Sequence, residues 1–597
     1  MLKIYITTLF ACLLLLSGCG KDKAETDQAD ADIYARVPAD TAYFFTNTES
    51  MDAELQEVMW QQMVAPLNDA LSNIYSDPLF TEEVEDDAME EIMQMQEKVL
   101  AFSTDIETPE QWEQKTGLAT QGQGVIYALE LSPVFNLPVT DAAKLEALIL
   151  DAVEALELTA GVVDVDGNPV NAVHGDADVP VAVYWSISND RLSATVLPDA
   201  TAAALLPQVF GAQYPTLPMS ASTFAQMNEK YGFAEIGSGF IKPPALYNVL
   251  ADETTQTHAM LAELAANTDD EDLQQMLDFV NDPICSAEMN DLLSRVPQIS
   301  LGLTEFTRQA YSTRVVTALD QRSKDLMQAM LGDAPIGNDP GGLFNMAVNI
   351  NVGNSIKALR TMAETALADP FQCAALLDLN DTAQDLVDAA NTPLPPFVGN
   401  MTGFAMQVAE IGNISFAEEN FDAAAMLEEL DTSIALYTSN AQMLLGMGQM
   451  FLPQLNGVDL QPGAEPQPID VPDMGMLKRP VYAALTEKAI GISYGESSTA
   501  GLAAMLQGSD AMTDALLTVG IDVQRYNALI NEAMQQAMEL ESLDEADDPE
   551  AYRDLQRTRE MMKNNLQYSE TLGQNFTSLG ITEDGLVMDT RQELQLD

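Results

Sequence analysis

Two histidines are the side chains of this 597-residue sequence whose ordinary pKa lies closest to neutral, so they are the first candidates for acid–base chemistry or metal binding. His174 lies in Val173-His174-Gly175-Asp176, which we expect to be a loop between two strands. His258 lies at the start of an expected helix. Neither has a second ligand at the spacing that zinc sites use. The sequence favours ordinary structural histidines, and we assign no metal ligand.

Motifs for nucleophilic or phosphate chemistry are missing from the sequence. No Gly-x-Ser-x-Gly elbow precedes a helix, and Gly237-Ser238-Gly239 is typical of a loop or bulge. There is no Gly-x-x-x-x-Gly-Lys and no Gly-x-Gly-x-x-Gly opening a helix. A Ser-His-Asp triad built from distant residues stays open, because the fold and not the spacing brings its members together. We assign no catalytic residue and expect no cofactor.

Carboxylates are too abundant for their proximity in sequence to indicate a site. The sequence has 92 acidic and 26 basic residues and a net charge of −66. Asp164-Val165-Asp166-Gly167-Asn168 comes nearest to a calcium loop, but Pro169 follows and Asp166-Gly167 favours a hairpin turn. The acidic runs are expected to be solvated helix faces or loops: 82–87, 269–272 and 544–548.

This charge excludes two classes of partner. Nucleic-acid binding requires a basic surface to neutralise phosphates. Adsorption to anionic lipid head groups likewise requires clustered Lys and Arg. We therefore expect no nucleic acid partner, and any contact with a membrane must be made in another way.

Methionine is the remaining residue type that could form a binding surface, with 31 in the chain. Met443, Met447 and Met450 follow helical spacing, as do Met89 and Met93. Helical spacing favours packing in the core. A soft groove for lipid or peptide is the alternative.

The first twenty residues have the pattern of an export signal. Lys3 precedes an apolar run from Ile4 to Leu16, which is too short to span a membrane and is followed by small residues. Leu16-Ser17-Gly18-Cys19 resembles the lipobox of bacterial prolipoproteins. The resemblance implies that residues 1–18 are removed and that Cys19 carries acyl chains on its sulfur and its new amino group. An ordinary cleaved signal in which Cys19 is incidental is the alternative.

The residues after Cys19 predict a location. In lipoproteins of this type an Asp after the lipidated Cys favours retention in the inner membrane, and here that residue is Gly20. We therefore expect an outer-membrane anchor with the body facing the periplasm. Residues 19–36 are polar and without apolar periodicity, which predicts a flexible tether. No later segment is apolar over 18 residues, so the membrane contact is expected to be the lipid on Cys19.

Four cysteines are present, and two of them remain for the folded body. Cys12 lies in the expected leader and Cys19 takes the lipid, which leaves Cys285 and Cys373. An even pair in an oxidising compartment predicts one disulfide. Two buried free thiols are the alternative. No Cys-x-x-Cys spacing is present.

Three local matches in the same order indicate an internal repeat. The matching segments are Leu301–Glu305 with Leu579–Glu583, Gly124–Leu129 with Gly403–Val408, and Val183–Ser188 with Val481–Thr486. Each match is weak, but strand and hairpin patterns accompany all three. We predict an α+β fold of two tandem diverged copies, residues 37–332 and 343–597. Each copy is expected to be a mostly antiparallel sheet with helices packed on one face.

A second resemblance concerns the start of the body. Val37-Pro38-Ala39-Asp40-Thr41 before Tyr43-Phe44-Phe45 resembles the opening of large uncharacterised bacterial exported proteins. It implies no activity.

These patterns predict a lipid-anchored envelope protein without enzymatic activity, which binds or organises an envelope protein, a peptide or a lipid. A periplasmic hydrolase and a carrier of lipid or peptide are the alternatives.

Overall fold

The computed structural model describes residues 34–595, apart from 48–50, 52, 62–105, 107, 156–157, 176–180, 235, 268–270, 337–340, 413–415, 418–419, 422–429, 452–459, 470–478, 508–513 and 541–570. The expected leader and Cys19 lie outside these residues. The chain forms two compact units, residues 1–307 (unit 1) and 308–597 (unit 2). Within the described ranges, no helix has the length and apolar character needed to cross a membrane.

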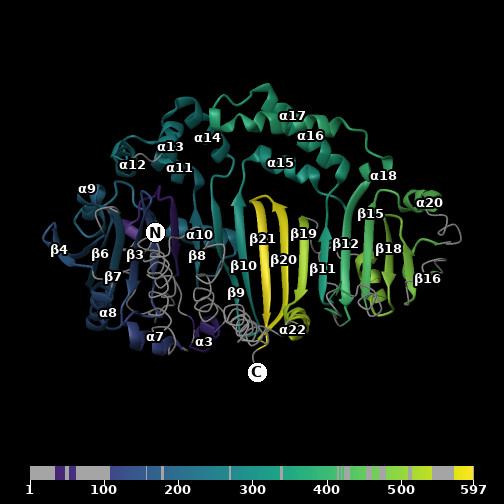
Figure 1. Ribbon diagram of the computed structural model, residues 1–597, viewed down its shortest axis with the longest axis horizontal. Helices are drawn as coiled ribbons and strands as arrows, with labels where there is room; N and C mark the ends of the chain where they lie inside the picture. The colour runs from purple at the N-terminus through teal and green to yellow at the C-terminus, as the bar shows by residue number, and fades with distance from the viewer. Residues whose placement is uncertain are drawn as a thin grey trace. The chain divides into compact units, whose positions relative to one another are not determined.

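The described part of unit 1 alternates hairpins with helices (Figure 1). Its strands are β1 (Tyr43–Thr46), β2 (Val125–Leu129), β3 (Ser132–Pro138), β4 (Ala160–Val165), β5 (Asn168–His174), β6 (Val181–Ser188), β7 (Arg191–Pro198), β8 (Ser238–Ile241) and β9 (Ile299–Phe306). Its helices are α3 (Ala53–Met59), α7 (Pro109–Thr116), α8 (Ala142–Ala155), α9 (Asp199–Val209), α10 (Ala221–Tyr231), α11 (Pro243–Ala251), α12 (Gln256–Asn267), α13 (Glu271–Asn281) and α14 (Pro283–Ser294).

The strands of unit 1 form one antiparallel sheet in the order β4-β5-β6-β7-β3-β2-β1-β8-β9. Two of its hairpins have tight turns, and the turn at Asp166-Gly167 is the one that the sequence predicts. Asp166 and Gly167 join β4 to β5, and Asn189 and Asp190 join β6 to β7, all four with positive φ. Positive φ at both central residues gives the turn twist that matches paired strands.

Helix ends in unit 1 follow local sequence rules. The Thr108 hydroxyl accepts a hydrogen bond from the backbone of Gln111, whose side chain bonds back to Thr108, and Gly117 ends α7 with φ +76°. Asp141 accepts a hydrogen bond from the backbone N–H of Lys144 at 3.0 Å at the start of α8. These caps satisfy backbone groups that a helix end leaves without partners.

Helices cover both faces of the unit 1 sheet, where the sequence predicted cover on one. Val134 packs in a core cluster with α9, whereas its neighbour Phe135 packs in a second cluster with Trp112 of α7 and Leu145 of α8. Adjacent residues of a strand point to opposite faces. Unit 1 therefore has two cores, because the side chains on both faces of its central strands are large and apolar. The α+β class and the mostly antiparallel sheet are confirmed.

The folded part of unit 1 begins before the expected end of the tether. The Tyr34 side chain is buried, and its ring lies 5.9 Å from that of Phe44 and 6.5 Å from that of Phe224. Arg36 Nη1 donates to the carbonyls of Gln208, Val209 and Gly211. Residues 34–36 thus belong to the core, and a tether could extend no further than residue 33.

The described part of unit 2 has a similar layout. Its strands are β10 (Ala310–Ala318), β11 (Phe344–Val348), β12 (Met401–Glu410), β13 (Phe416–Ala417), β14 (Asn420–Phe421), β15 (Asp431–Thr438), β16 (Gly463–Ile469), β17 (Val481–Leu485), β18 (Ala489–Tyr494), β19 (Ala515–Asp522), β20 (Leu572–Thr582) and β21 (Gly585–Leu594). Its helices are α15 (Gln321–Met330), α16 (Val352–Ala368), the short η2 (Ala374–Leu376), α17 (Asp378–Asn391), α18 (Pro396–Gly399), α20 (Ala441–Phe451), α21 (Thr499–Gln507) and α22 (Val523–Leu540).

The main sheet of unit 2 is antiparallel in the order β16-β17-β18-β15-β12-β11-β19-β20-β21-β10. The pair β20 and β21, drawn in yellow in Figure 1, lies beside β10. Arg314 of β10 and Asp589 of β21 are directly opposite, and two hydrogen bonds of 2.6 and 3.0 Å join them. These bonds raise the pKa of the Arg314 guanidinium above its ordinary value.

The two units repeat one order of strands. The series β6-β7-β3-β2-β1-β8-β9 in unit 1 corresponds to β17-β18-β15-β12-β11-β19-β20 in unit 2. Helix α9 follows β7, and α21 follows β18 in the same way. A shared order over seven strands supports the tandem duplication. The expected break between copies, 332–342, lies between β10 and β11, whereas the compact units divide after Thr307.

One predicted match between the copies is out of register. Val125 and Tyr127 of β2 pack with α9, but the residues that pack with α21 on β12 include Ala405, not Phe404 and Met406. Aligning Gly124 with Gly403 pairs Val125 and Tyr127 with Phe404 and Met406. The paired side chains would then lie on opposite faces of the two sheets. Short apolar strands resemble one another at any register, and a shift of one residue reverses the face.

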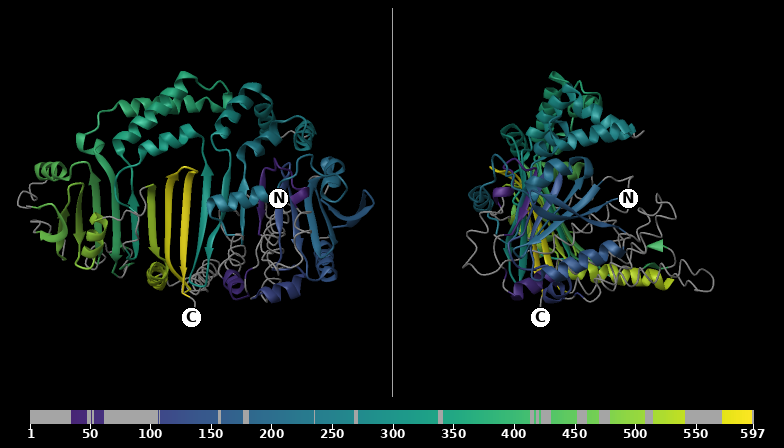
Figure 2. Two further views of the ribbon diagram at one scale, coloured as in Figure 1. Left: turned by 180° about the vertical axis from the view of Figure 1, so that it is seen from behind. Right: turned by 90° about the vertical axis from the view of Figure 1, so that its left-hand side faces the viewer.

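Helix α21 packs on one face of the unit 2 sheet, where Leu502, Met505 and Leu506 contact Ala405 and Ala435. Helices α15, α16 and α17 lie beyond one end of the strands of this unit, and neither view in Figure 2 places them over a face. They pack mainly on each other. Helix α22 contacts β20 and β19. The candidate surface described next lies on the face of the central strands that is opposite α21.

Candidate functional site

The central strands of unit 2 reverse the usual alternation of apolar and polar residues. On β15, Asp431, Ser433 and Ala435 are buried, whereas Ile434 is 41% exposed. On β18, Ser493 is buried and Ile492 is 48% exposed. A half-exposed antiparallel strand ordinarily turns its apolar side chains inward. Here small and polar residues face α21, and the large apolar residues face outward.

The outward residues form two rows across the sheet. Paired positions run from β18 through β15, β12, β11, β19, β20 and β21 to β10 in the first row, and from β18 to β19 in the second. All are at least partly exposed. We call them the open face: Ile490, Leu436, Phe404, Val348, Leu517, Leu579, Met588 and Val315 in one row, and Ile492, Ile434, Met406, Met346 and Val519 in the other. Contiguous exposed apolar surface on a soluble body is typical of a binding site.

Helix α20 borders this surface. Ala441 and Leu445 of α20 pack against Ile490, so the helix lies at the rim of the open face. Met443 is 36% exposed and Met450 is 80% exposed. Packing in the core, which the helical spacing favoured, is therefore wrong for these two residues. Both lie on the side of α20 roughly opposite Ala441 and Leu445, so they point away from the open face.

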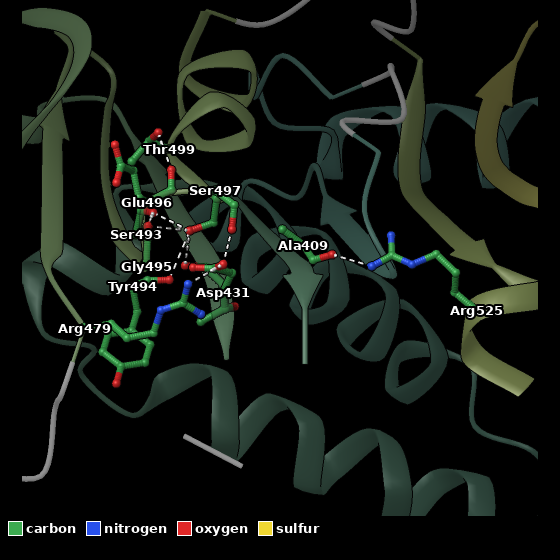
Figure 3. A network of polar contacts seen from close by, with 12 residues as sticks. Ala409, Asp431, Arg479, Ser493, Tyr494, Gly495, Glu496, Ser497, Thr499 and Arg525 are labelled. Atoms are coloured by element: carbon green, nitrogen blue, oxygen red, sulfur yellow. Dashed lines mark hydrogen bonds and ion pairs between the residues drawn. The ribbon is translucent and has the colours of Figure 1, made fainter. Parts of the chain in front are cut away.

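A buried charge network holds the opposite side of β15 (Figure 3). The Asp431 side chain is fully buried, and its Oδ2 accepts from Arg479 Nη2 at 3.0 Å and from the Ser497 hydroxyl. A buried carboxylate is stable only when a partner compensates its charge. Asp431 thus joins three segments of unit 2: the start of β15, the segment just before β17 and the turn after β18.

Three buried serines extend this network toward α21. Ser498 Oγ lies 2.5 Å from Ser493 Oγ and within reach of the carbonyls of Thr432 and Gly495. Ser433 Oγ donates to the Ser498 carbonyl at 2.8 Å. The three serine hydroxyls all have partners, and satisfied groups of this kind favour one packing arrangement. The network orients β15 and β18, whose other sides carry Ile434 and Ile492.

Glycine is required at position 495 in this network. Gly495 has φ +87°, and a Cβ built on it would lie 1.4 Å from Asp431 Oδ1. Both the backbone conformation and the carboxylate exclude a side chain. The turn Gly495-Glu496-Ser497-Ser498 can close on Asp431 only because its first residue has no Cβ.

Two further side chains of unit 2, Tyr437 and Asp333, have shifted pKa values. Burial raises the pKa of Tyr437 above its ordinary value, and its hydroxyl donates to the Met505 carbonyl at 2.8 Å. The hydrogen bond from Lys488 holds the pKa of Asp333 below its ordinary value. Tyr437 fastens α21 to β15, and Asp333 fastens the turn after β17.

The cysteines predicted for the folded body are confirmed as half-cystines. Cys285 and Cys373 are both buried and disulfide-bonded. Asp282 accepts from the backbone N–H groups of Ile284 and Cys285 at the start of α14. Cys19, the predicted lipidation site, lies outside the described residues.

The histidines occupy structural positions. His174 is the last residue of β5, not part of a loop, and its Nδ1 lies 2.9 Å from Asp199 Oδ1. His258 lies in α12, as expected, and its Nδ1 lies 2.7 Å from the Leu250 carbonyl. No group of three or more potential metal-ligating side chains occurs among the described residues.

The acidic segments have mixed outcomes. Asp166 and Gly167 form the predicted hairpin turn, and Asp164 Oδ1 accepts from the Gly167 N–H at 3.1 Å. Of the run 269–272, Glu271 and Asp272 form the first turn of α13, where the helix dipole favours negative charge. The runs 82–87 and 544–548 lie outside the described residues, as do Met89 and Met93.

Comparisons with known proteins identify no family. No family model matches the sequence, and no curated protein matches it. A solved structure titled "Structure of crystal form III of TP0453" has 8% sequence identity and a TM-score of 0.22, and it covers 51% of this chain and 89% of that chain.

The matching segments Gly403–Val408 and Leu579–Glu583 lie on strands of the open face, but the sequence predicted neither β15 and β19 nor the face itself. Ile434 and Ile492 alternate with small or polar residues, as they would on an ordinary half-buried strand. One feature of the sequence could have indicated the open face. The residues that alternate with Ile434 and Ile492 are too small to fill a core by themselves: Ser433, Ala435, Gly491 and Ser493. They are small because α21 packs directly on them.

Proposed function

We propose that this chain is a non-enzymatic binding protein of the bacterial cell envelope, anchored by lipid on Cys19 and facing the periplasm. Leu16-Ser17-Gly18-Cys19 after an apolar run supports the anchor. The open face of unit 2 carries the proposal for binding, because it presents thirteen partly exposed apolar side chains in a chain of net charge −66. The partner is expected to be an envelope protein, peptide or lipid that offers an apolar surface.

The anchor predicts that Cys19→Ser releases the protein from membranes. Two or more acyl chains hold a protein stably on a bilayer, and each buried methylene contributes about 0.8 kcal/mol. Fractionation of cells and labelling with radioactive palmitate measure the effect. Cys12→Ser, within the expected leader, is the matched control and should stay membrane-bound and labelled. A Cys19→Ser protein that still sediments with membranes, with unchanged mass, would contradict the anchor.

The open face predicts binding of an uncharged apolar dye. We expect the native protein to enhance Nile red fluorescence, and Ile434→Glu with Ile492→Glu to remove at least half of the enhancement. Both side chains are more than 40% exposed, so the charges should change the free energy of unfolding by no more than about 1 kcal/mol. Urea unfolding checks that the variant remains folded.

The matched control places the same two charges elsewhere. Val162→Glu with Leu217→Glu replaces apolar residues of unit 1 that are 67% and 71% exposed and lie outside the open face. This control should bind Nile red as the native protein does. Equal loss in both double variants would show that the dye does not report on the open face.

A further inference from the structure

The internal repeat shows what covers the counterpart of the open face in unit 1. In the shared order of strands, β2, β3 and β7 of unit 1 correspond to β12, β15 and β18 of unit 2. Helices α9 and α21 pack on one face of these strands, each in its own unit. On the other face of unit 1, Trp112 of α7 and Leu145 of α8 pack in one cluster with Phe135 of β3. The counterpart of the open face is therefore covered by helices.

The same face is buried in one unit and exposed in the other. Phe135 of β3 is paired with Ala194 of β7, and these two residues are 5% and 3% exposed. On the corresponding face of unit 2, Ile434 of β15 is paired with Ile492 of β18, and these are 41% and 48% exposed. Unit 2 therefore presents to solvent large apolar residues of a kind that unit 1 covers.

The difference lies in the segment that joins two central strands in each unit. In unit 1 the residues between β1 and β2 include α7, whose Trp112 packs with the sheet. In unit 2 the residues between β11 and β12 form α16, α17 and α18, and α16 and α17 lie beyond one end of the strands (Figure 2). Helix α20 follows β15 as α8 follows β3, and it packs against Ile490. In the described part of unit 2, α20 thus takes the place of α8 on this face, whereas the helices in the chain position of α7 lie elsewhere.

We propose that the open face binds an amphipathic helix of a partner protein, which covers β12, β15 and β18 as α7 covers the corresponding strands of unit 1. This inference rests on the proposed function and names the class of partner. Strands β12 and β15 are each paired on both sides, so their face offers side chains and not a backbone edge to an extended peptide. A helix satisfies its own backbone groups and can therefore place an apolar stripe on such a face.

Charges at the ends of these strands favour a basic helix. Glu410 is the last residue of β12, and Glu487 and Glu496 lie just before and just after β18. All three are exposed, and the neighbouring Lys488 already pairs with Asp333. Lys or Arg on the polar side of the bound helix would meet these carboxylates in a chain of net charge −66. The expected partner therefore combines an apolar stripe with basic residues.

Binding of a synthetic helix tests the proposal. The probe is a fluorescently labelled, hydrocarbon-stapled helix of about 15 residues, because helices of this length are marginal in water without a constraint. It carries Leu and Trp on one side and Lys on the other. The full-length Cys19→Ser protein is used, so the result does not depend on the anchor. We expect saturable binding by fluorescence anisotropy, and a stapled peptide of the same composition without an apolar side should bind at least about tenfold more weakly.

Substitutions on the open face separate apolar contact from attraction between charges. Ile434→Glu with Ile492→Glu adds two carboxylates, which would strengthen a purely electrostatic complex with the Lys-rich helix. We expect binding to weaken at least about tenfold instead, because these charges would be buried against the apolar side of the helix. Val162→Glu with Leu217→Glu is the matched control and should bind the helix like the parent. If the open-face double variant does not fold, Ile492→Ser alone should weaken binding about threefold or more.

Hydrogen exchange locates the bound helix. Added protection is expected in the peptides that contain β12, β15 and β18. Protection confined to other strands, equal affinity for the peptide without an apolar side, or unchanged affinity in the folded open-face variant would overturn the proposal.

Two measurements separate failure of this inference from failure of the proposed function. If Nile red binds at the open face but the stapled helix does not, the helix is the wrong occupant and the face remains a binding surface. If neither binds there, both proposals fail. Phosphatidylcholine vesicles test a lipid occupant: binding of the Cys19→Ser protein to them that is lost with Ile434→Glu and Ile492→Glu, without binding of the helix, would replace the helix with lipid.

Discussion

Gly495→Ala is expected to lower the free energy of unfolding of unit 2 by about 3 kcal/mol or more. A residue with a Cβ pays about 1–2 kcal/mol in the left-handed conformation that Gly495 adopts. The methyl group would also displace the Asp431 carboxylate from Arg479 and Ser497, and breaking a buried ion pair costs about 3–5 kcal/mol. Hydrogen exchange in the peptides that contain β15 and β18 measures the loss of protection. Tryptophan emission should change little, because all tryptophans lie in unit 1.

Gly341→Ala is the matched control for this substitution. Gly341 also lies in unit 2 and has φ +77°, but a Cβ built on it meets nothing within 4 Å. Gly341→Ala should therefore lower the free energy of unfolding only by the backbone contribution, about 1–2 kcal/mol. If the two substitutions lower the free energy of unfolding equally, Asp431 does not lie close to position 495 in solution.

Removing the disulfide is expected to have the second large effect. Cys285→Ala with Cys373→Ala should lower the free energy of unfolding by about 4–5 kcal/mol, because the bond closes a loop of 88 positions in the unfolded chain. Urea unfolding of the oxidised native protein and of the double variant measures the difference. Alanine fills most of the space of a buried cysteine, so lost packing contributes less than the lost cross-link.

Reduction gives an independent check on the same bond. Denatured native protein should yield no free thiol at Cys285 or Cys373 before reductant is added and two afterwards. Its unfolding midpoint in reductant should move to that of the double variant. A midpoint that is unchanged by reductant and by substitution would contradict the stabilising role.

Local sequence signals predicted the hairpins well. Asp166-Gly167 and Asn189-Asp190 tolerate positive φ, and strong strand patterns flank both turns. Three local matches in the same order predicted a duplication, which the shared order of seven strands supports. The predicted register between copies was wrong, because Gly124–Leu129 and Gly403–Val408 fit each other almost equally well when shifted by one residue.

The candidate surfaces depend on contacts between residues far apart in the sequence. Asp431 is one of 92 acidic residues, and nothing near it in sequence distinguishes it. Its role follows from Arg479 and Ser497, which are 48 and 66 positions away. The three tryptophans are similarly scattered over residues 60–185 and meet only in the folded core.

The sequence by itself determined the α+β class, the hairpin turn at Asp166-Gly167 and the cysteines available for a disulfide, because local backbone preferences and composition set these features. The tertiary structure decided which face of each strand is buried. Alternation along a strand specifies two faces but does not say which of them another element will cover. In unit 2, α21 covers the small residues around Ser433 and Ser493, and the large apolar residues are left partly exposed.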